Sequence, residues 1–124
     1  MAVLEAAPGG PFSQSINLCT ALGGNVDSTN TADRGGLRRS ALLRIASVAG
    51  TTVTVNIVGS ADGTNFYNVA YSASATPETV AVAALVITTT TTSYFVLRPE
   101  HPWRFLKLVL SANTGMTLTA DLAA

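Results

Sequence analysis

Hydrophobic and polar residues alternate along most of this chain, and the alternation is clearest between Thr51 and Ser72. Apolar residues at every second position give a strand one buried side and one solvent-facing side. Asp62 and Gly63 interrupt the pattern, and this pair favours a tight turn because glycine tolerates positive φ. The segment therefore predicts a β-hairpin. Its first arm places Val53, Val55 and Ile57 on one face, and its second arm places Tyr67, Val69 and Tyr71 on one face.

Two segments before this hairpin show the same period, residues 13–22 and residues 37–48. A helix is the alternative for residues 37–48, because leucine, arginine and alanine are good helix formers. We favour a strand, since this segment runs through Ala49 and Gly50 directly into the hairpin. That pair predicts a tight connection between antiparallel neighbours. Residues 23–36 are polar and glycine-rich, and they predict a long loop.

Three segments after the hairpin also alternate, and each predicts a strand. They cover residues 94–98, 103–111 and 116–122. Residues 112–115 read Ala-Asn-Thr-Gly and predict a turn, so the last two segments are expected to form a second hairpin. The residues expected to face the core in these two arms are Leu106, Leu108, Leu110, Met116, Leu118, Ala120 and Leu122.

Residues 78–88 differ from the other predicted strands because both of their faces are apolar. Such a strand is either covered on both sides or lies at a contact between subunits. One face carries Val80, Val82, Ala84 and Val86, and the other carries Ala81, Ala83, Leu85 and Ile87.

Residues 1–12 contain two prolines and two glycines, so they predict an extended arm and no regular element of their own. Val3, Leu4 and Phe12 are nevertheless apolar, which is unusual for a disordered tail. The arm is expected either to lie on its own domain or to pack on a neighbouring molecule, and the sequence favours neither.

About eight strands follow one another, with turn signals every ten residues or so. This spacing predicts an all-β fold: an antiparallel β-sandwich, or a small jelly roll or barrel. A chain of 124 residues is long enough for one domain with one core. We therefore expect a single β domain over residues 13–124, preceded by the arm at 1–12.

Charged residues are scarce, at 11 % of the chain against roughly 25 % in soluble domains. Either the exposed surface is neutral and threonine-rich, or other subunits cover much of it; we favour the second, because depletion of charge marks interface cores. The formal net charge is zero, which indicates no nucleic-acid or membrane partner. The cluster formed by Arg34, Arg38, Arg39 and Arg44 is interpreted as a solvated strand face with a few ion pairs.

No metal or cofactor site is expected. His101 is the only histidine and lies between two prolines, so the sequence offers it no recognisable partner ligand. Asp27 and Asp33 lie in the predicted loop, but acidic residues there are too sparse for a calcium-binding pattern. We interpret both as turn-forming residues.

No enzymatic activity is expected either. Cys19 is the single cysteine and is interpreted as a small buried apolar residue. Ser60 and Asp62 lie in a Gly-Ser-Ala-Asp-Gly stretch that looks catalytic, but its place in the predicted hairpin explains both as turn formers. The N-terminus lacks a basic stretch and carries Glu5, so no signal peptide is expected. We expect synthesis in the host cytoplasm.

Two stretches resemble a known family. Residues 55–69, VNIVGSADGTNFYNV, resemble a hairpin that is common in small structural proteins of tailed bacteriophages. Residues 103–111, WRFLKLVLS, resemble the strand that usually follows, before a glycine-containing turn and a last strand. The resemblance covers about half of the chain, and a similar hairpin and strand also occur in discoidin-like, sugar-binding jelly rolls.

The phage resemblance implies a virion component, in the first place a decoration (cement) protein on the outer capsid surface. Such proteins bind the major capsid protein and bridge capsomers, commonly as trimers or other symmetric oligomers. Burial of apolar area at a capsomer junction would stabilise the assembled shell. The residues expected to make these contacts are Val3, Leu4 and Phe12 in the arm, with Val80, Val82 and Val86.

Two other functions stay open: a structural role in the tail or spike of a virion, and a carbohydrate-binding module. Sugar binding requires exposed aromatic residues. The obvious candidates, most of which are interpreted as core residues, are Tyr67, Tyr71, Tyr94 and Trp103.

Deletion of residues 1–12 is predicted to abolish binding to assembled shells while the β domain stays folded. Shell occupancy of the truncated chain, measured by co-sedimentation, tests this prediction. Undiminished occupancy would contradict the role assigned to the arm.

Overall fold

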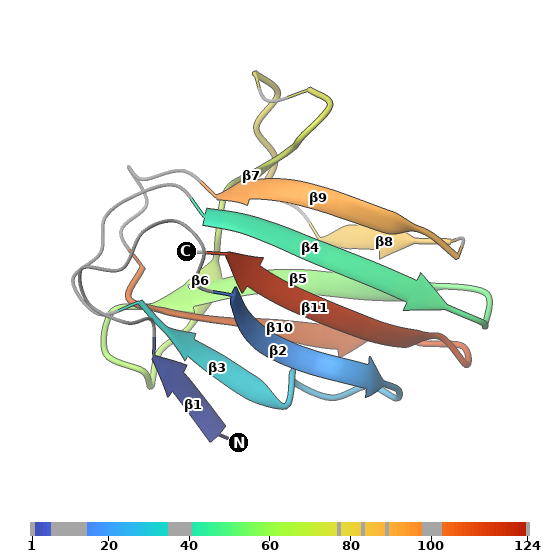
Figure 1. The fold of residues 1–124 in the computed structure, drawn as a ribbon, viewed down its shortest axis with the longest axis horizontal. Helices are drawn as coiled ribbons and strands as arrows, with labels where there is room; N and C mark the ends of the chain where they lie inside the picture. The colour runs from blue at the N-terminus through green and yellow to red at the C-terminus, as the bar shows by residue number, and fades with distance from the viewer. Residues whose placement is uncertain are drawn as a thin grey trace.

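Two β-sheets packed face to face form the protein (Figure 1). The computed structural model describes residues 2–5, 15–34, 41–76, 78–82, 84–88, 90–97 and 103–123, which hold eleven strands and no helix. The six-stranded sheet has the order β1 (Ala2–Glu5), β3 (Asn30–Asp33), β10 (Phe105–Ser111), β5 (Val53–Ser60), β6 (Tyr67–Asn68), and β8 (Leu85–Ile87) also pairs with β5. The five-stranded sheet has the order β2 (Ser15–Leu22), β11 (Thr117–Ala123), β4 (Ala41–Val48), β9 (Thr92–Leu97), β7 (Tyr71–Ala73).

The connections follow a jelly-roll pattern, in which the chain passes repeatedly from one sheet to the other. Among the eleven described strands, only β5 and β6 are both consecutive in the chain and paired with each other. All described pairs are antiparallel except β1 with β3, which are parallel. The all-β sandwich of the jelly-roll type is thus confirmed, and the described strands number eleven where about eight were expected.

The core lies between the sheets and is built from the inward faces of the four longest central strands. Period two is kept along β4, β10 and β11 and along the first half of β5, because each has one face in the core and the other more exposed; the last four residues of β5, 57–60, are all buried. The faces predicted from the sequence are therefore confirmed for these strands. Their fully or nearly fully buried residues are Ala41, Leu43, Ile45, Val53, Val55, Ile57, Leu106, Leu108, Leu110, Leu118, Ala120 and Leu122.

The predicted second hairpin is wrong. β10 pairs with β5 and β3 in the six-stranded sheet, whereas β11 pairs with β2 and β4 in the five-stranded sheet. The connection at Ala49 and Gly50 likewise carries the chain from β4 in one sheet to β5 in the other. The alternation determines which face of a strand is buried, but it does not identify the strand's hydrogen-bonded neighbour.

The first predicted hairpin is confirmed only in part. β6 pairs with β5 through Asn68 opposite Val58 and Tyr67 opposite Gly59, and the chain then crosses to β9 in the other sheet as β7. The crossing removes the alternation, because the four residues at 69–72 are all buried. Tyr67 is exposed instead of sharing a face with Val69 and Tyr71.

The predicted loop at residues 23–36 contains a strand, β3, that the sequence analysis missed. Its residues are polar, yet Thr31, Ala32 and Asp33 are buried between β1 and β10. Asp33 is not a turn residue, because its carboxylate accepts two hydrogen bonds from Arg104, at 2.8 Å from Nε and 3.0 Å from Nη2. A charge-assisted ion pair of this geometry stabilises Asp33 at a buried position, where an apolar side chain would otherwise be expected.

Cys19 is fully buried, as expected, although the alternation places it with the polar residues of its strand. Shifts in the register between β2 and β11 bring Cys19 opposite Ala120 and turn its side chain inward. The thiol lies 3.5 Å from the carbonyl oxygen of Leu118, to which it donates. Burial raises its pKa to about 11, so the thiolate that nucleophilic chemistry requires is disfavoured.

Two of the connections between the sheets pack directly against each other. The backbone N–H of Thr51 donates to Thr114 at 3.1 Å, and the backbone N–H of Thr114 donates to Thr52 at 2.9 Å. Gly50 has a φ of 73°, and a Cβ added to it would lie 2.4 Å from the backbone nitrogen of Met116. Only glycine therefore fits this contact.

Replacement of Gly50 by alanine is predicted to destabilise the fold by about 3 kcal/mol, because the added methyl group meets backbone as well as an unfavourable φ. Gly24→Ala is the matched control: Gly24 also has a positive φ, of 83°, but nothing lies within 4 Å of an added Cβ. Its cost is expected to be about 1 kcal/mol. Chemical denaturation measures both, and equal costs would contradict the close packing of the two turns.

Candidate docking surface

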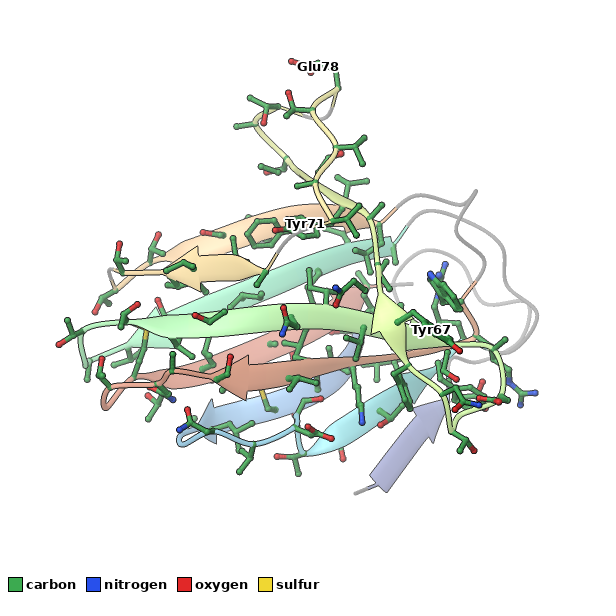
Figure 2. The ribbon with its side chains drawn as sticks, turned by 180° about the vertical axis from the view of Figure 1, so that it is seen from behind. Tyr67, Tyr71 and Glu78 are labelled. Atoms are coloured by element: carbon green, nitrogen blue, oxygen red, sulfur yellow. The ribbon has the colours of Figure 1, made fainter. Side chains whose placement is uncertain are left out.

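A projecting loop between β7 and β8 is the most prominent surface feature of the molecule (Figures 1 and 2). We call its described residues, 74–76 and 78–82, the finger. Its base is closed by two backbone hydrogen bonds between Tyr71 and Ala81, each 2.9 Å long. Toward the tip, the N–H of Thr76 donates to Ala73 and that of Thr79 donates to Thr76, both at 3.0 Å. These backbone hydrogen bonds therefore hold the loop as it projects from the sandwich.

The finger corrects the prediction of one continuous strand over residues 78–88. Only β8, at Leu85–Ile87, pairs with β5, while Ala81 bonds back to Tyr71 near the other sheet. The described residues between these two anchors, Val82 and Ala84, belong to neither sheet. A run of β-branched and apolar residues favours extended backbone, but it does not require a single pairing partner along its length.

The two apolar faces predicted for this segment are both present. Ala81 and Leu85 are half-buried against the core, and Ile87 is buried. Val80, Val82 and Val86 point the other way and are 47 %, 53 % and 58 % exposed. The described residues leave much of each of these side chains uncovered, so three valines that were expected at a contact are accessible to a partner.

The finger stands on a rigid base. The Tyr71 ring is buried and meets the Phe95 ring edge-on, with centroids 5.6 Å apart and planes at 90°. Edge-to-face contact is a favoured geometry for aromatic pairs. Desolvation raises the pKa of the Tyr71 hydroxyl, which keeps this buried group neutral. Tyr71, the residue at the base of the finger, is thus part of the core.

The beginning of the predicted arm is a strand on its own domain. β1 pairs in parallel with β3, with Val3 opposite Thr31 and Leu4 opposite Ala32. It forms one edge of the six-stranded sheet, whereas β6 and β8 lie toward the other edge, beyond β10 and β5. Phe12 lies outside the described residues. The structure therefore does not bring Val3 and Leu4 together with the finger: they lie on opposite sides of the molecule (Figure 1).

The predicted arginine cluster is not a continuous basic surface. Arg34 is buried, Arg44 pairs with Asp121 at 3.3 Å, and Arg38 and Arg39 lie outside the described residues. Asn17 donates a further hydrogen bond to Asp121 at 2.9 Å. The ion pair expected on a solvated strand face is confirmed at Arg44, and the solvated position expected for Arg34 is wrong.

The two residues of the catalytic-looking stretch lie in a turn. Ser60 and Asp62 form the turn that was predicted: the Ser60 hydroxyl donates to the Asp62 carboxylate at 2.8 Å, as do the backbone N–H groups of Thr64 (2.8 Å) and Asn65 (2.9 Å). These hydrogen bonds hold the pKa of Asp62 well below its usual range. Asp27, expected to form a turn, instead makes an isolated antiparallel bridge with Val109 of β10, and its carboxylate pairs with Lys107 at 2.8 Å.

The described ranges also offer neither a cluster of metal ligands nor a membrane-spanning helix. No group of three or more histidine, cysteine or acidic residues is placed to hold a metal ion. No helix is present that is long and apolar enough to cross a membrane. His101 lies outside the part of the chain that the structure describes.

The fold and its surface define an all-β jelly-roll sandwich with an apolar projection. No family model matches the sequence, and no curated protein matches it. The crystal structure of the SPBc2 prophage-derived protein YomS has a similar fold, with a TM-score of 0.65 over 88 % of this chain and 89 % of that chain. At 10 % sequence identity, this similarity establishes the fold alone.

The hydrogen bonds around Asp62 predict a pH dependence of stability. Because folding lowers the pKa of this carboxyl group, its contribution is complete above the ordinary value of 3.8 and is lost as the pH falls below it. Asp62→Asn keeps an oxygen acceptor without the titration. The melting temperature of the variant is therefore expected to fall less than that of the original chain between pH 5 and about pH 2.5. Parallel curves for the two proteins would contradict this account.

Proposed function

We propose that this chain is a virion structural protein of a tailed bacteriophage, specifically a capsid decoration protein that binds the outer head surface. The observation that carries the proposal is the finger, which exposes Val80 and Val82 on an ordered projection. A monomeric protein gains no stability from valines held away from its core. A protein that inserts them into a partner does gain it.

The proposed mechanism is mass action. A protein that binds the assembled shell and not its separated parts shifts the equilibrium toward assembly, by about 2.7 kcal/mol per site at a free concentration of 100 times Kd. Burial of each finger valine would contribute about 1.5 kcal/mol to that affinity. The partner is the major capsid protein at a junction between capsomers.

Bridging requires at least two separate contacts, and the shape of the molecule supports this requirement. The edge formed by β1 and the finger lie on opposite sides of the sandwich (Figure 1). Copies that join head to tail through two different surfaces close into a ring when the rotation fits. We therefore propose a symmetric homo-oligomer, with a trimer favoured, in which the β1 edge of each copy contacts a different surface of the next copy and each finger is left to contact the shell.

Composition and fold support the same function. The chain is 11 % charged and has zero formal net charge, which suits a surface covered by other subunits. Its fold is similar to that of a prophage-derived protein. Jelly rolls are common in viral structural proteins, although a fold does not by itself determine a function.

The location of the protein on purified virions tests the proposal most directly. Gold-labelled antibody and electron microscopy are expected to place it on the head, with a copy number that follows the capsomer lattice. Labelling confined to the tail or spike would contradict the head assignment and support the alternative virion role. Absence from virions would contradict both. Native mass spectrometry is expected to show a trimer, and a monomer at all concentrations would contradict the oligomer.

Replacement of both finger valines by serine, V80S with V82S, is predicted to weaken shell binding about 100-fold, which corresponds to the loss of about 3 kcal/mol of apolar burial. Val48→Ser is the matched control, because Val48 is 59 % exposed at the end of β4 and away from the finger. Co-sedimentation with shells that lack the protein measures both. Equal binding by the finger variant and the control would contradict docking through the finger.

A further inference from the structure

Tyr67, an exposed residue of β6, stacks on Trp103, which is the only tryptophan of the chain. The rings of Tyr67 and Trp103 have centroids 5.8 Å apart and planes inclined by 27°. Tyr67 is 58 % exposed even though one side of its ring is in contact with Trp103. The most exposed aromatic residue of the described chain thus lies on a second ring instead of in the core.

The Trp103 ring of this stacked pair packs against the backbone at Gly59. A Cβ at Gly59 would lie 2.5 Å from Cγ and 2.7 Å from Cβ of Trp103, so the tryptophan packs directly on backbone. Gly59 is also the strand partner of Tyr67 in the ladder between β5 and β6. The loop that precedes β6 is fixed by the hydrogen bonds to Asp62. Both rings are therefore positioned before any ligand arrives, which lowers the entropy cost of binding.

The geometry points to a binding platform for a neutral sugar ring, with the outward face of Tyr67 as the contact. The face of an aromatic ring is electron-rich, and the C–H groups on one side of a hexose are weakly positive, so the two attract each other while apolar area is buried. Thr64 and Asn65, exposed in the loop just before β6, offer hydroxyl and amide groups to the sugar hydroxyls.

Charge favours a neutral sugar over an acidic one. The two cations next to the stacked pair in the sequence are both neutralised: Arg104 by Asp33, and Lys107 by Asp27. Lys107 also lies over the Phe66 ring, 4.2 Å from its centroid. An anionic sugar would therefore find no uncompensated positive charge supplied by these two side chains, and we assign the ligand as a neutral polysaccharide.

This inference does not rest on docking through the finger. Tyr67 and Glu78 near the finger tip lie well apart in the structure, with Tyr71 between them (Figure 2). A molecule attached through its finger leaves Tyr67 open to solvent. Sugar binding and shell binding can therefore fail or succeed independently.

The single tryptophan makes the experiment direct, because Trp103 is in contact with Tyr67 and dominates the emission of the protein. The oligomer is screened on an array of neutral glycans and then titrated with dextran, β-glucan and galactomannan while Trp103 fluorescence is recorded. At least one neutral polysaccharide is expected to bind and to change the emission saturably. Tyr67→Leu keeps an apolar cover over Trp103 without the ring, and it is expected to weaken binding at least tenfold, whereas Tyr67→Phe stays within about threefold.

Tyr94 supplies the matched control. It is 42 % exposed on β9, opposite Arg44 on β4, in the other sheet. Tyr94→Leu is expected to change the affinity less than twofold. Nitration by tetranitromethane adds a test on the unaltered protein: saturating polysaccharide is expected to protect Tyr67 and not Tyr94, as mapped by mass spectrometry.

Several outcomes would overturn the inference. They are the absence of any neutral glycan that binds, equal losses for Tyr67→Leu and Tyr94→Leu, and nitration of Tyr67 that polysaccharide does not slow. Binding of peptides in place of glycans would also overturn it. If Tyr67→Leu does not fold, the nitration result decides on its own.

Discussion

The whole molecule depends on the burial of one face of β5 and β10 against one face of β4 and β11. These four strands supply long rows of apolar side chains, which alternate with more exposed residues everywhere except in the second half of β5, and their inner residues are almost completely buried. Burial at roughly 25 cal/mol per Å² of apolar surface is the main favourable term in a domain of this size. The chain crosses from one sheet to the other at nearly every connection. Most loops therefore join strands whose relative position is set by the packing of the two sheets. The packed turns at Gly50 and Thr114 fix the spacing of the sheets at one end.

The central strands fill the space between the two sheets, so the remaining apolar residues must lie on the surface. Val80, Val82 and Val86 are exposed residues of a segment from which Ala81, Leu85 and Ile87 pack against the core. Tyr67 is held outside by the same crossing that takes Tyr71 inside. The proposed docking surface and the proposed sugar platform thus flank residues 69–72, where the chain leaves the six-stranded sheet after β6 and four consecutive residues are buried. Both proposed functional surfaces therefore lie next to a segment whose residues do not alternate between the core and the solvent.

The sequence could predict the buried faces, because period two depends only on each strand's own residues. It could not predict which strands are neighbours. Residues 103–111 and 116–122 look like a hairpin in isolation, and only the competition among all strands for core positions separates them into two sheets. β3 was missed because its residues are mostly polar, and the partners that bury it, the strands β1 and β10 and the Arg104 side chain that pairs with Asp33, are distant in the sequence. The exposed valines of the finger were identified from the sequence, since a second apolar face on one segment has no room in a two-layer fold. Tyr67 was assigned to the wrong face because the sheet crossing that follows it leaves no local signal.

The scarcity of charge connects the fold with the proposed function. In the part of the chain that the structure describes, Arg44, Arg104 and Lys107 are each paired with a carboxylate, so these cations add little unbalanced field to a chain whose formal net charge is zero. A free monomer with so weak a field has little electrostatic protection against association. Association would then be directed by shape and apolar area alone: a projecting finger, a strand edge and two stacked rings. A protein that must spread evenly over a repeated lattice gains from this property, because copies that carry no net charge do not repel one another as the lattice fills.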